Sequence, residues 1–194
     1  MSDYVTMKEF VAALQQLPPG NPCDPDMIAL MAQYRIAPEE LERYVVWDDE
    51  HYTRHLVYRD DRFQVILLGW GVGQVTPVHD HAGQCCWMRI EAGRLQMSDY
   101  KWKEGAGPPS LLNEETVGGP SNDLHLDRCA SVHRIANPEQ WGERAISLHV
   151  YSRPFSECGI YCLETGKKEV TPLQFDSIGP YSQGTASLEA GAAQ

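Results

Sequence analysis

The sequence lacks the features of several large protein classes. Its 194 residues contain no run of basic side chains and no internal repeat, and the formal net charge is −11. Because nucleic acids and anionic membranes attract positive surfaces, this charge argues against both as partners. No stretch has the apolar length of a membrane span, and the first ten residues do not form a secretory signal. We expect a cytoplasmic protein that acts as a monomer.

The six cysteines do not form the spacing pattern of a disulfide framework. Cys85 and Cys86 are adjacent, and the pair Cys158 and Cys162 has no matching second pair. We therefore expect free thiols, as in a reducing compartment, and interpret Cys158 and Cys162 as ordinary strand residues. A chain of this length buries a core without cross-links, which predicts one domain over residues 1–194.

Helical spacing of apolar residues is confined to the first fifty residues. Thr6 and Glu9 have the spacing of a capping box before a first helix, and Asp24 and Pro25 open a second one. The helices are predicted over residues 6–17, 24–34 and 38–44. We expect this segment, residues 1–50, to pack on one side of the rest of the chain.

From residue 51 onward the apolar period changes to two. Strands are predicted over residues 52–57, 63–68, 86–90, 94–100, 132–135, 144–151, 159–163 and 168–173, with a further strand at a pair of histidines, His79 and His81. Residues 103–123 are interpreted as a loop or weak edge strands, and residues 176–194 as a polar tail on the surface. Short strands between Gly and Pro turns predict a mainly β fold, a sandwich or barrel over residues 51–175.

His79 and His81 are two positions apart, so a strand would present both imidazoles on one face, as two ligands of one metal require. The alternative is a strand with two incidental histidines. Gly73 and Gly93 frame the pair, and the whole stretch resembles the first cupin motif. That resemblance implies a cupin barrel, the double-stranded β-helix. Cys86 stands where many cupins have a metal-binding glutamate.

The candidate for a third ligand is His133, which with Asn137 resembles the end of the second cupin motif. His125 is the competing candidate, whereas His51 and His55 are interpreted as structural. Three histidines without a carboxylate leave a divalent ion its full charge, which suits a substrate with an anionic donor such as a thiolate.

Two further groups of polar residues lie on predicted strands. Ser147, His149 and Tyr151 share one face, where they could form a hydrogen-bonded chain; the alternative is a solvated polar face. Arg54 follows Tyr52 with the same spacing. An arginine here is a surface or paired residue, unless it lies in a pocket and binds a carboxylate.

Together these residues resemble the cysteine dioxygenase family of cupin-fold iron enzymes. The shared motifs are YTRHLV (52–57), HDH (79–81), Cys86, His133, SLHVYS (147–152) and GTASLE (184–189). The resemblance implies an enzyme that uses Fe(II) and O2 to oxidise L-cysteine to L-cysteine sulfinic acid. It assigns the iron ligands to His79, His81 and His133, and binding of the substrate carboxylate to Arg54 assisted by Tyr52. It also assigns a hydrogen-bonded relay to Ser147, His149 and Tyr151, and a thioether cross-link to Cys86 and Tyr151.

Two departures from the family pattern touch no proposed ligand. Arg153 precedes Pro154 where many members have proline, and Cys85 stands where some have histidine. Dioxygenases of another small thiol, 3-mercaptopropionate, typically have glutamine in place of the arginine, so Arg54 favours cysteine. The remaining hypotheses are a non-catalytic metal-binding cupin and a zinc-dependent cupin isomerase or hydrolase.

Overall fold

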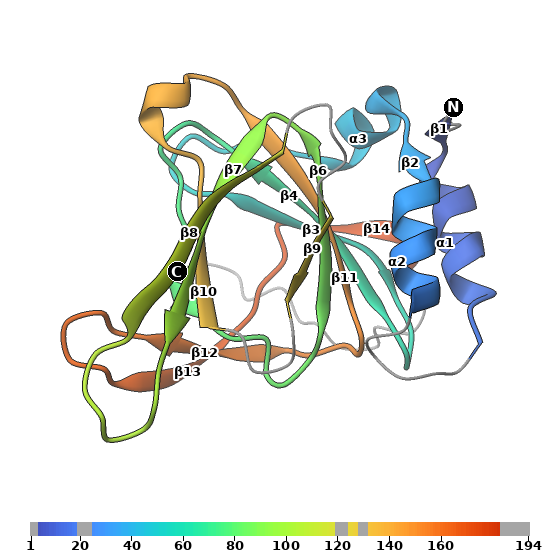
Figure 1. The fold of residues 1–194 in the computed structure, drawn as a ribbon. Helices are drawn as coiled ribbons and strands as arrows, with labels where there is room; N and C mark the ends of the chain where they lie inside the picture. The colour runs from blue at the N-terminus through green and yellow to red at the C-terminus, as the bar shows by residue number, and fades with distance from the viewer. Residues whose placement is uncertain (1–3, 19–24, 119–123, 128–131, 183–194) are drawn as a thin grey trace, which may run out of the picture.

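The computed structural model describes residues 4–18, 25–118, 124–127 and 132–182, which form two facing β-sheets with helices on one side (Figure 1). The central sheet contains, in spatial order, β14 (Ser177–Ser182), β3 (Thr53–Arg59), β4 (Gln64–Trp70), β11 (Ala145–Tyr151), β6 (Cys86–Ala92) and β9 (Leu124–Asp127). The facing sheet contains β13 (Lys168–Pro172), β12 (Glu157–Tyr161), β5 (Val78–His79), β10 (Val132–Ala136), β7 (Arg94–Lys101) and β8 (Ser110–Gly118). The predicted mainly β double-stranded β-helix is confirmed, although hydrogen bonds do not close the two sheets, as far as their residues are described, into one continuous barrel.

The predicted helices are present as α1 (Met7–Gln15), α2 (Pro25–Gln33) and α3 (Pro38–Tyr44). The capping box is confirmed, because the Glu9 amide donates to the Thr6 hydroxyl and the Glu9 carboxylate accepts from the Thr6 amide. The Asp24 cap lies outside the described residues. Two short strands, β1 (Tyr4–Val5) and β2 (Arg35–Ile36), pair in parallel beside the helices, and one 3-10 turn, η1 (Glu139–Trp141), precedes β11. None of the described helices has the length and apolar character needed to cross a membrane.

The middle strands β4 and β11 of the central sheet are buried on both faces. Ile146, Leu148 and Val150 of β11 belong to a core cluster with the apolar residues of α1 and α2. The alternate residues Ser147, His149 and Tyr151 face the other sheet and are at most 4% exposed. The alternative of a solvated polar face is therefore excluded for this strand.

The helices are also joined to the sheet by a buried arginine. Arg89 of β6 is 1% exposed, donates to the Met31 and Tyr34 carbonyls at the end of α2, and forms an ion pair with Glu91 at 2.5 Å. Guanidinium donors thus satisfy carbonyls that the helix end leaves without helical partners.

Two predictions of strand position need correction, those for His81 and for the C-terminal tail, and a third is decided between its alternatives. β5 ends at His79, so His81 follows the strand instead of sharing its face. The segment interpreted as a loop or weak edge strands contains β8, a nine-residue strand that pairs along β7 at the edge of its sheet, so the edge-strand alternative is confirmed. The predicted tail begins with β14, which pairs in parallel with β3, and the GTASLE motif lies outside the described residues.

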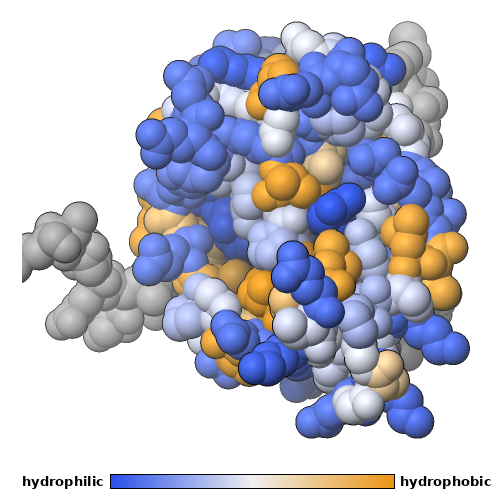
Figure 2. Space-filling model, turned by 90° about the vertical axis from the view of Figure 1, so that its left-hand side faces the viewer, coloured by the Kyte–Doolittle hydropathy of each residue, from blue (hydrophilic) through white to orange (hydrophobic). Residues whose placement is uncertain are grey.

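The surface seen from the left of Figure 1 is largely hydrophilic, with hydrophobic side chains in separate patches (Figure 2). Across the described residues, the large apolar side chains that are more than half exposed include Leu111 and Leu112 on β8 and Val170 on β13. The hydrophobic surface on this face is thus divided among patches and not gathered in one area.

Candidate active site

A pocket of about 730 Å³ opens between the two sheets. Most of the residues singled out from the sequence lie on its wall, including Tyr52, Arg54, His79, His81, His149 and Tyr151. Its apolar wall includes Leu68, Ile135 and Ile160, and Cys158 adds a buried thiol. The fold therefore gathers residues from distant parts of the sequence around one space.

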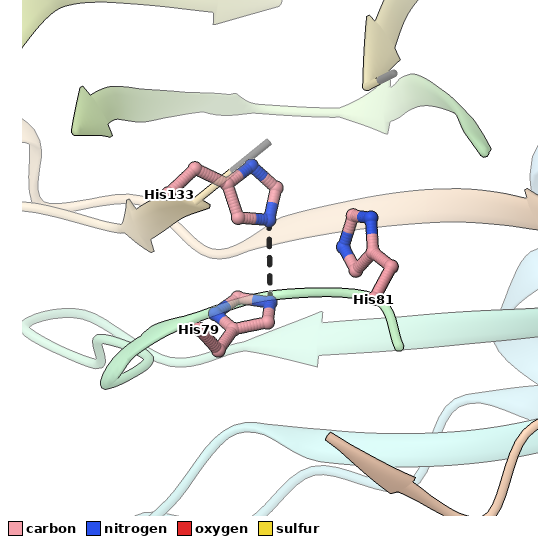
Figure 3. Close-up of side chains that lie close together, drawn as sticks. All are labelled: His79, His81 and His133. Atoms are coloured by element: carbon pink, nitrogen blue, oxygen red, sulfur yellow. Dashed lines mark hydrogen bonds between the residues drawn. The ribbon is translucent and has the colours of Figure 1, made fainter. Parts of the chain in front are cut away.

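His79, His81 and His133 converge beside this pocket (Figure 3). The candidate ligand atoms of the three imidazoles all lie within 4.8 Å of one another, and Nε2 of His133 is 3.2 Å from Nε2 of His79. His79 on β5 and His133 on β10 are directly opposite in an antiparallel pair, so their side chains share a face. His81 and His133 are buried, so this set could hold a metal ion away from bulk water.

The carboxylate of Asp80 holds the turn that directs His81 toward His79 and His133 after β5 has ended. This carboxylate accepts from the Tyr161 hydroxyl at 2.6 Å, Lys168 Nζ at 2.7 Å, the Gly159 amide at 3.0 Å and the Ala82 amide at 2.9 Å. Burial alone would raise the pKa of Asp80, but the hydrogen bonds from Lys168 and Tyr161 hold that pKa below its usual range. The carboxylate between the two histidines thus fixes the turn, a role that no sequence pattern predicted.

The framing glycine Gly93 has a backbone reason to be glycine. It adopts a φ of +67°, and a Cβ there would lie 2.5 Å from the Arg144 carbonyl oxygen. A residue with a side chain would be strained and would push β11 away from the β6–β7 turn. The motif glycine therefore keeps the strands of the site in register.

The competing histidine, His125, lies in a second group of metal-ligand type together with Asp99 and His133. The candidate ligand atoms of these three side chains also lie within 4.8 Å of one another. His125 on β9 is partly buried, and its Nδ1 is 3.3 Å from the Glu115 carboxylate. The fold thus brings both third-ligand candidates to one place.

Arg54 and Tyr52 lie on the pocket wall at the start of β3. Nε and Nη2 of Arg54 are buried and have no hydrogen-bond partner among the described residues. The guanidinium lies over the Phe175 ring at 5.7 Å, and Tyr52 stacks on Trp70 with ring centroids 4.9 Å apart. Burial raises the pKa of Tyr52, against the opposing effect of Arg54, so the phenol stays protonated.

The polar row of β11 contacts Cys86 across the sheet. Ser147 Oγ is 2.8 Å from His149 Nε2 and accepts from the Trp70 indole N–H at 2.9 Å. Cys86 Sγ is 3.6 Å from His149 Nδ1, and Cys86 is directly opposite Tyr151 in the β6–β11 register. The Tyr151 ring lies 5.3 Å from the His81 ring, which brings this row to the metal-ligand group.

Some residues near the pocket received another interpretation from the sequence. Cys158 is buried on its wall, and burial raises the pKa of its thiol; nothing in its spacing distinguishes it from a core cysteine. His55 is buried and hydrogen-bonded to Thr53, Ser177 and the Val46 amide, as expected of a structural histidine. His51, also interpreted as structural, is exposed at the pocket rim, 3.3 Å from Asp176.

Comparison with known proteins gives matches over most of the chain. The family model described as cysteine dioxygenase type I matches residues 2–163. Human cysteine dioxygenase type 1 is 28% identical over 174 residues, covering 89% of this chain and 86% of the human protein. The zebrafish (Danio rerio) protein of that name is 27% identical, covering 88% and 86%. A solved Klebsiella pneumoniae protein with a double-stranded β-helix domain has 16% identity and a TM-score of 0.44, covering 69% and 94%.

Proposed function

Because the chain belongs to the cysteine dioxygenase type I family, we propose that it oxidises L-cysteine with O2 to L-cysteine sulfinic acid. The observation that carries the proposal is one pocket with a cluster of three imidazoles beside it and, on its wall, an arginine with two buried, unbonded nitrogens. Membership of this family makes the chain a thiol dioxygenase, and the hypothesis of a non-catalytic metal-binding cupin is not favoured.

His79, His81 and His133 would hold the metal ion, and we propose that this ion is Fe(II). Imidazole nitrogens suit iron, and their spacing within 4.8 Å fits one ion after small side-chain movements. When bound, iron supplies the redox chemistry with O2 and favours the thiolate form of the substrate. The three neutral ligands leave the ion its double positive charge, which attracts that thiolate.

Arg54 is proposed to bind the substrate carboxylate. Buried guanidinium nitrogens without hydrogen-bond partners are unfavourable, so Nε and Nη2 of Arg54 favour an anionic ligand in the pocket. A guanidinium fork matches a carboxylate with two parallel hydrogen bonds. Tyr52 assists as a protonated phenol that can donate to the same ligand, and its stacking on Trp70 fixes its ring.

Ser147 and His149 are proposed to hold Tyr151 and Cys86 in place. The Ser147 oxygen accepts from Trp70, so its own proton is available for Nε2 of His149. A neutral imidazole has one donor and one acceptor nitrogen, so Nδ1 of His149 then carries the proton and faces Cys86 Sγ. In this arrangement Tyr151 presents its hydroxyl to the bound substrate.

We further propose a thioether between Cys86 Sγ and the Tyr151 ring carbon next to the hydroxyl. Directly opposite residues in an antiparallel pair have Cβ atoms about 4.5–5.5 Å apart, within reach of such a bond. The thiol and the ring each lose one hydrogen, and O2 accepts the two electrons and two protons during turnover.

Peptide mass spectrometry tests the thioether. The peptides of Cys86 and Tyr151 should be joined after turnover and stay joined in reductant, and the link should be absent in Cys86→Ser and Tyr151→Phe. Cys162→Ser, a change at an exposed cysteine, should keep it. Unlinked peptides after prolonged turnover would contradict the bond.

The proposed function is tested by metal analysis together with O2 uptake. The isolated protein should contain iron, consume O2 with L-cysteine and release cysteine sulfinic acid. Zinc without O2 uptake would indicate an isomerase or hydrolase, and a preference for 3-mercaptopropionate would indicate the other thiol. His79→Ala, His81→Ala or His133→Ala should lose iron, whereas full iron in His133→Ala with loss in His125→Ala would contradict the ligand assignment.

The remaining proposals concern organisation and environment. We propose that residues 1–194 form one domain, supported by the core cluster that joins α1 and α2 to the central sheet. A monomer in the cytoplasm, without nucleic-acid or membrane partners, is supported by the net charge of −11 and by the free thiols of Cys158 and Cys162.

A further inference from the structure

Asp99, His125 and His133 form a cluster that the proposed function does not fully use. His133 is opposite His79 on one side and opposite Asp99 of β7 on the other, so all three side chains share one face of their sheet. His125 comes from β9 of the central sheet. The cluster therefore joins the two sheets beside the three histidines.

We propose that Asp99, His125 and His133 form a second binding site for a divalent cation of the zinc or ferrous type. Two imidazole nitrogens and one carboxylate oxygen are a donor set that suits such ions. Their candidate ligand atoms lie within 4.8 Å of one another. Ligand atoms on opposite sides of a zinc ion are about 4.4 Å apart at most, so small side-chain rotations close the cluster around one ion.

Glu115 of β8 gives this site a partner outside its ligands. Its carboxylate is 3.3 Å from Nδ1 of His125. Metal-binding histidines commonly have a carboxylate on their second nitrogen, because it fixes the ring and raises its basicity. The charges of Asp99 and Glu115 also favour a cation here.

The two sites share His133, so they exclude each other. Nε2 of His133 lies 3.2 Å from Nε2 of His79, so the ring faces the first group. A neutral imidazole has a single acceptor nitrogen and can bind only one ion at a time. An ion at the second site therefore removes His133 from the first, and this consequence for activity rests on the proposed function.

The binding itself is tested without any activity measurement. The full-length His79→Ala/His81→Ala double variant lacks two ligands of the first site. After chelation, we expect it to bind one Co²⁺ per chain, seen by calorimetry and by the visible absorption of the bound ion. Adding His125→Gln or Asp99→Asn should weaken binding by at least the ~10–100-fold that loss of an outer partner costs. Adding His51→Gln, a change at an exposed histidine, should leave the affinity unchanged.

No Co²⁺ binding by the folded double variant would overturn the proposal, as would binding that neither His125→Gln nor Asp99→Asn weakens.

The shared use of His133 has its own test in the iron-loaded wild-type protein. The Zn²⁺ concentration that inhibits cysteine oxidation by half should be lower for the wild-type protein than for His125→Gln, by about tenfold or more. If Zn²⁺ inhibited both proteins equally, the two metal sites would not exclude each other. If the iron-loaded protein does not oxidise cysteine, the proposed function fails while the binding result stands.

Discussion

The two faces of the central sheet are both buried at its middle strands β4 and β11, yet they differ in chemistry. On β11, Ile146, Leu148 and Val150 face the helices within an apolar core. Ser147, His149 and Tyr151 face the other sheet, and the last two line the pocket. Successive side chains of a strand point to opposite faces, so one strand supplies both surfaces. We call the helix-facing side of the sheet its outer face and the pocket-facing side its inner face. Substitutions at adjacent positions should therefore act on different properties: stability on the outer face and catalytic activity on the inner face.

The largest effect is expected at a buried charge on the outer face. Arg89→Met leaves the Glu91 carboxylate buried without its cation and removes the donors to the Met31 and Tyr34 carbonyls. Removing one partner of a buried ion pair costs about 3–5 kcal/mol of unfolding free energy. Urea unfolding monitored by circular dichroism measures the loss.

Arg94→Met is the matched control for this change. Arg94 pairs with Glu143 at 3.0 Å, but both side chains are about half exposed, so the loss should stay below about 1 kcal/mol. Metal content per folded chain should not change in either variant. If Arg89→Met and Arg94→Met destabilised the protein equally, burial would not explain the loss at Arg89.

A smaller difference is expected between neighbours on β11. Leu148→Ala should cost about 3 kcal/mol, because it leaves a cavity in the helix-facing core, while metal binding remains. Tyr151→Phe should cost no more than about 1 kcal/mol but lower kcat/KM for cysteine. Urea midpoints and O2 uptake on the same samples check both. A Leu148→Ala protein that is stable but inactive would contradict the idea that the helix-facing residues determine stability and the pocket-facing residues determine activity.

Much of the fold was predictable from local signals. The capping box of Thr6 and Glu9 and the alternation of β11 are short-range patterns, and both are present in the structure. β9 and β14 were not predictable in this way, because each is defined by its partner: β9 by β6 and β14 by β3. The polar composition around them is typical of a loop when the pairing strand is unknown.

For the candidate site, the sequence predicted which residues come together but not how. His79, His81 and His133 are near one another, yet the orientation of His81 depends on Asp80 and its partners Tyr161 and Lys168, which are far along the chain. Asp99 was hidden within an ordinary strand pattern. Its proximity to His133 follows only from the register of β7 and β10.

The inner face is tested through Arg54, an immediate neighbour of the outer-face residue His55. Arg54→Ala should lower kcat/KM for cysteine by about 1.5–3 kcal/mol, or roughly 10–150-fold, because a charge-assisted bond to the substrate carboxylate is lost. Oxidation of cysteamine, which has no carboxylate, should change little. O2 uptake with both thiols measures this, and equal losses would count against carboxylate binding.

The smallest effect belongs to His55 on the outer face and appears as a pH dependence. Burial lowers the pKa of His55 below its usual 6.5, so the folded protein favours the neutral ring. On acidification the unfolded chain therefore takes up the proton first. Stability from this residue is complete above about pH 6.5 and declines as the pH falls toward the folded-state pKa, by at most ~1.4 kcal/mol per pH unit.

Urea midpoints between pH 7.5 and pH 5 should show this decline in the wild type and a flatter profile in His55→Gln. His51 provides a control of opposite sign. Its hydrogen bond to Asp176 raises its pKa, so the stability it contributes is present at low pH and is lost as the pH rises. His51→Gln should therefore make the acid-side decline steeper. If both variants shifted the profile in the same direction, burial and pairing would not be what separates these two histidines.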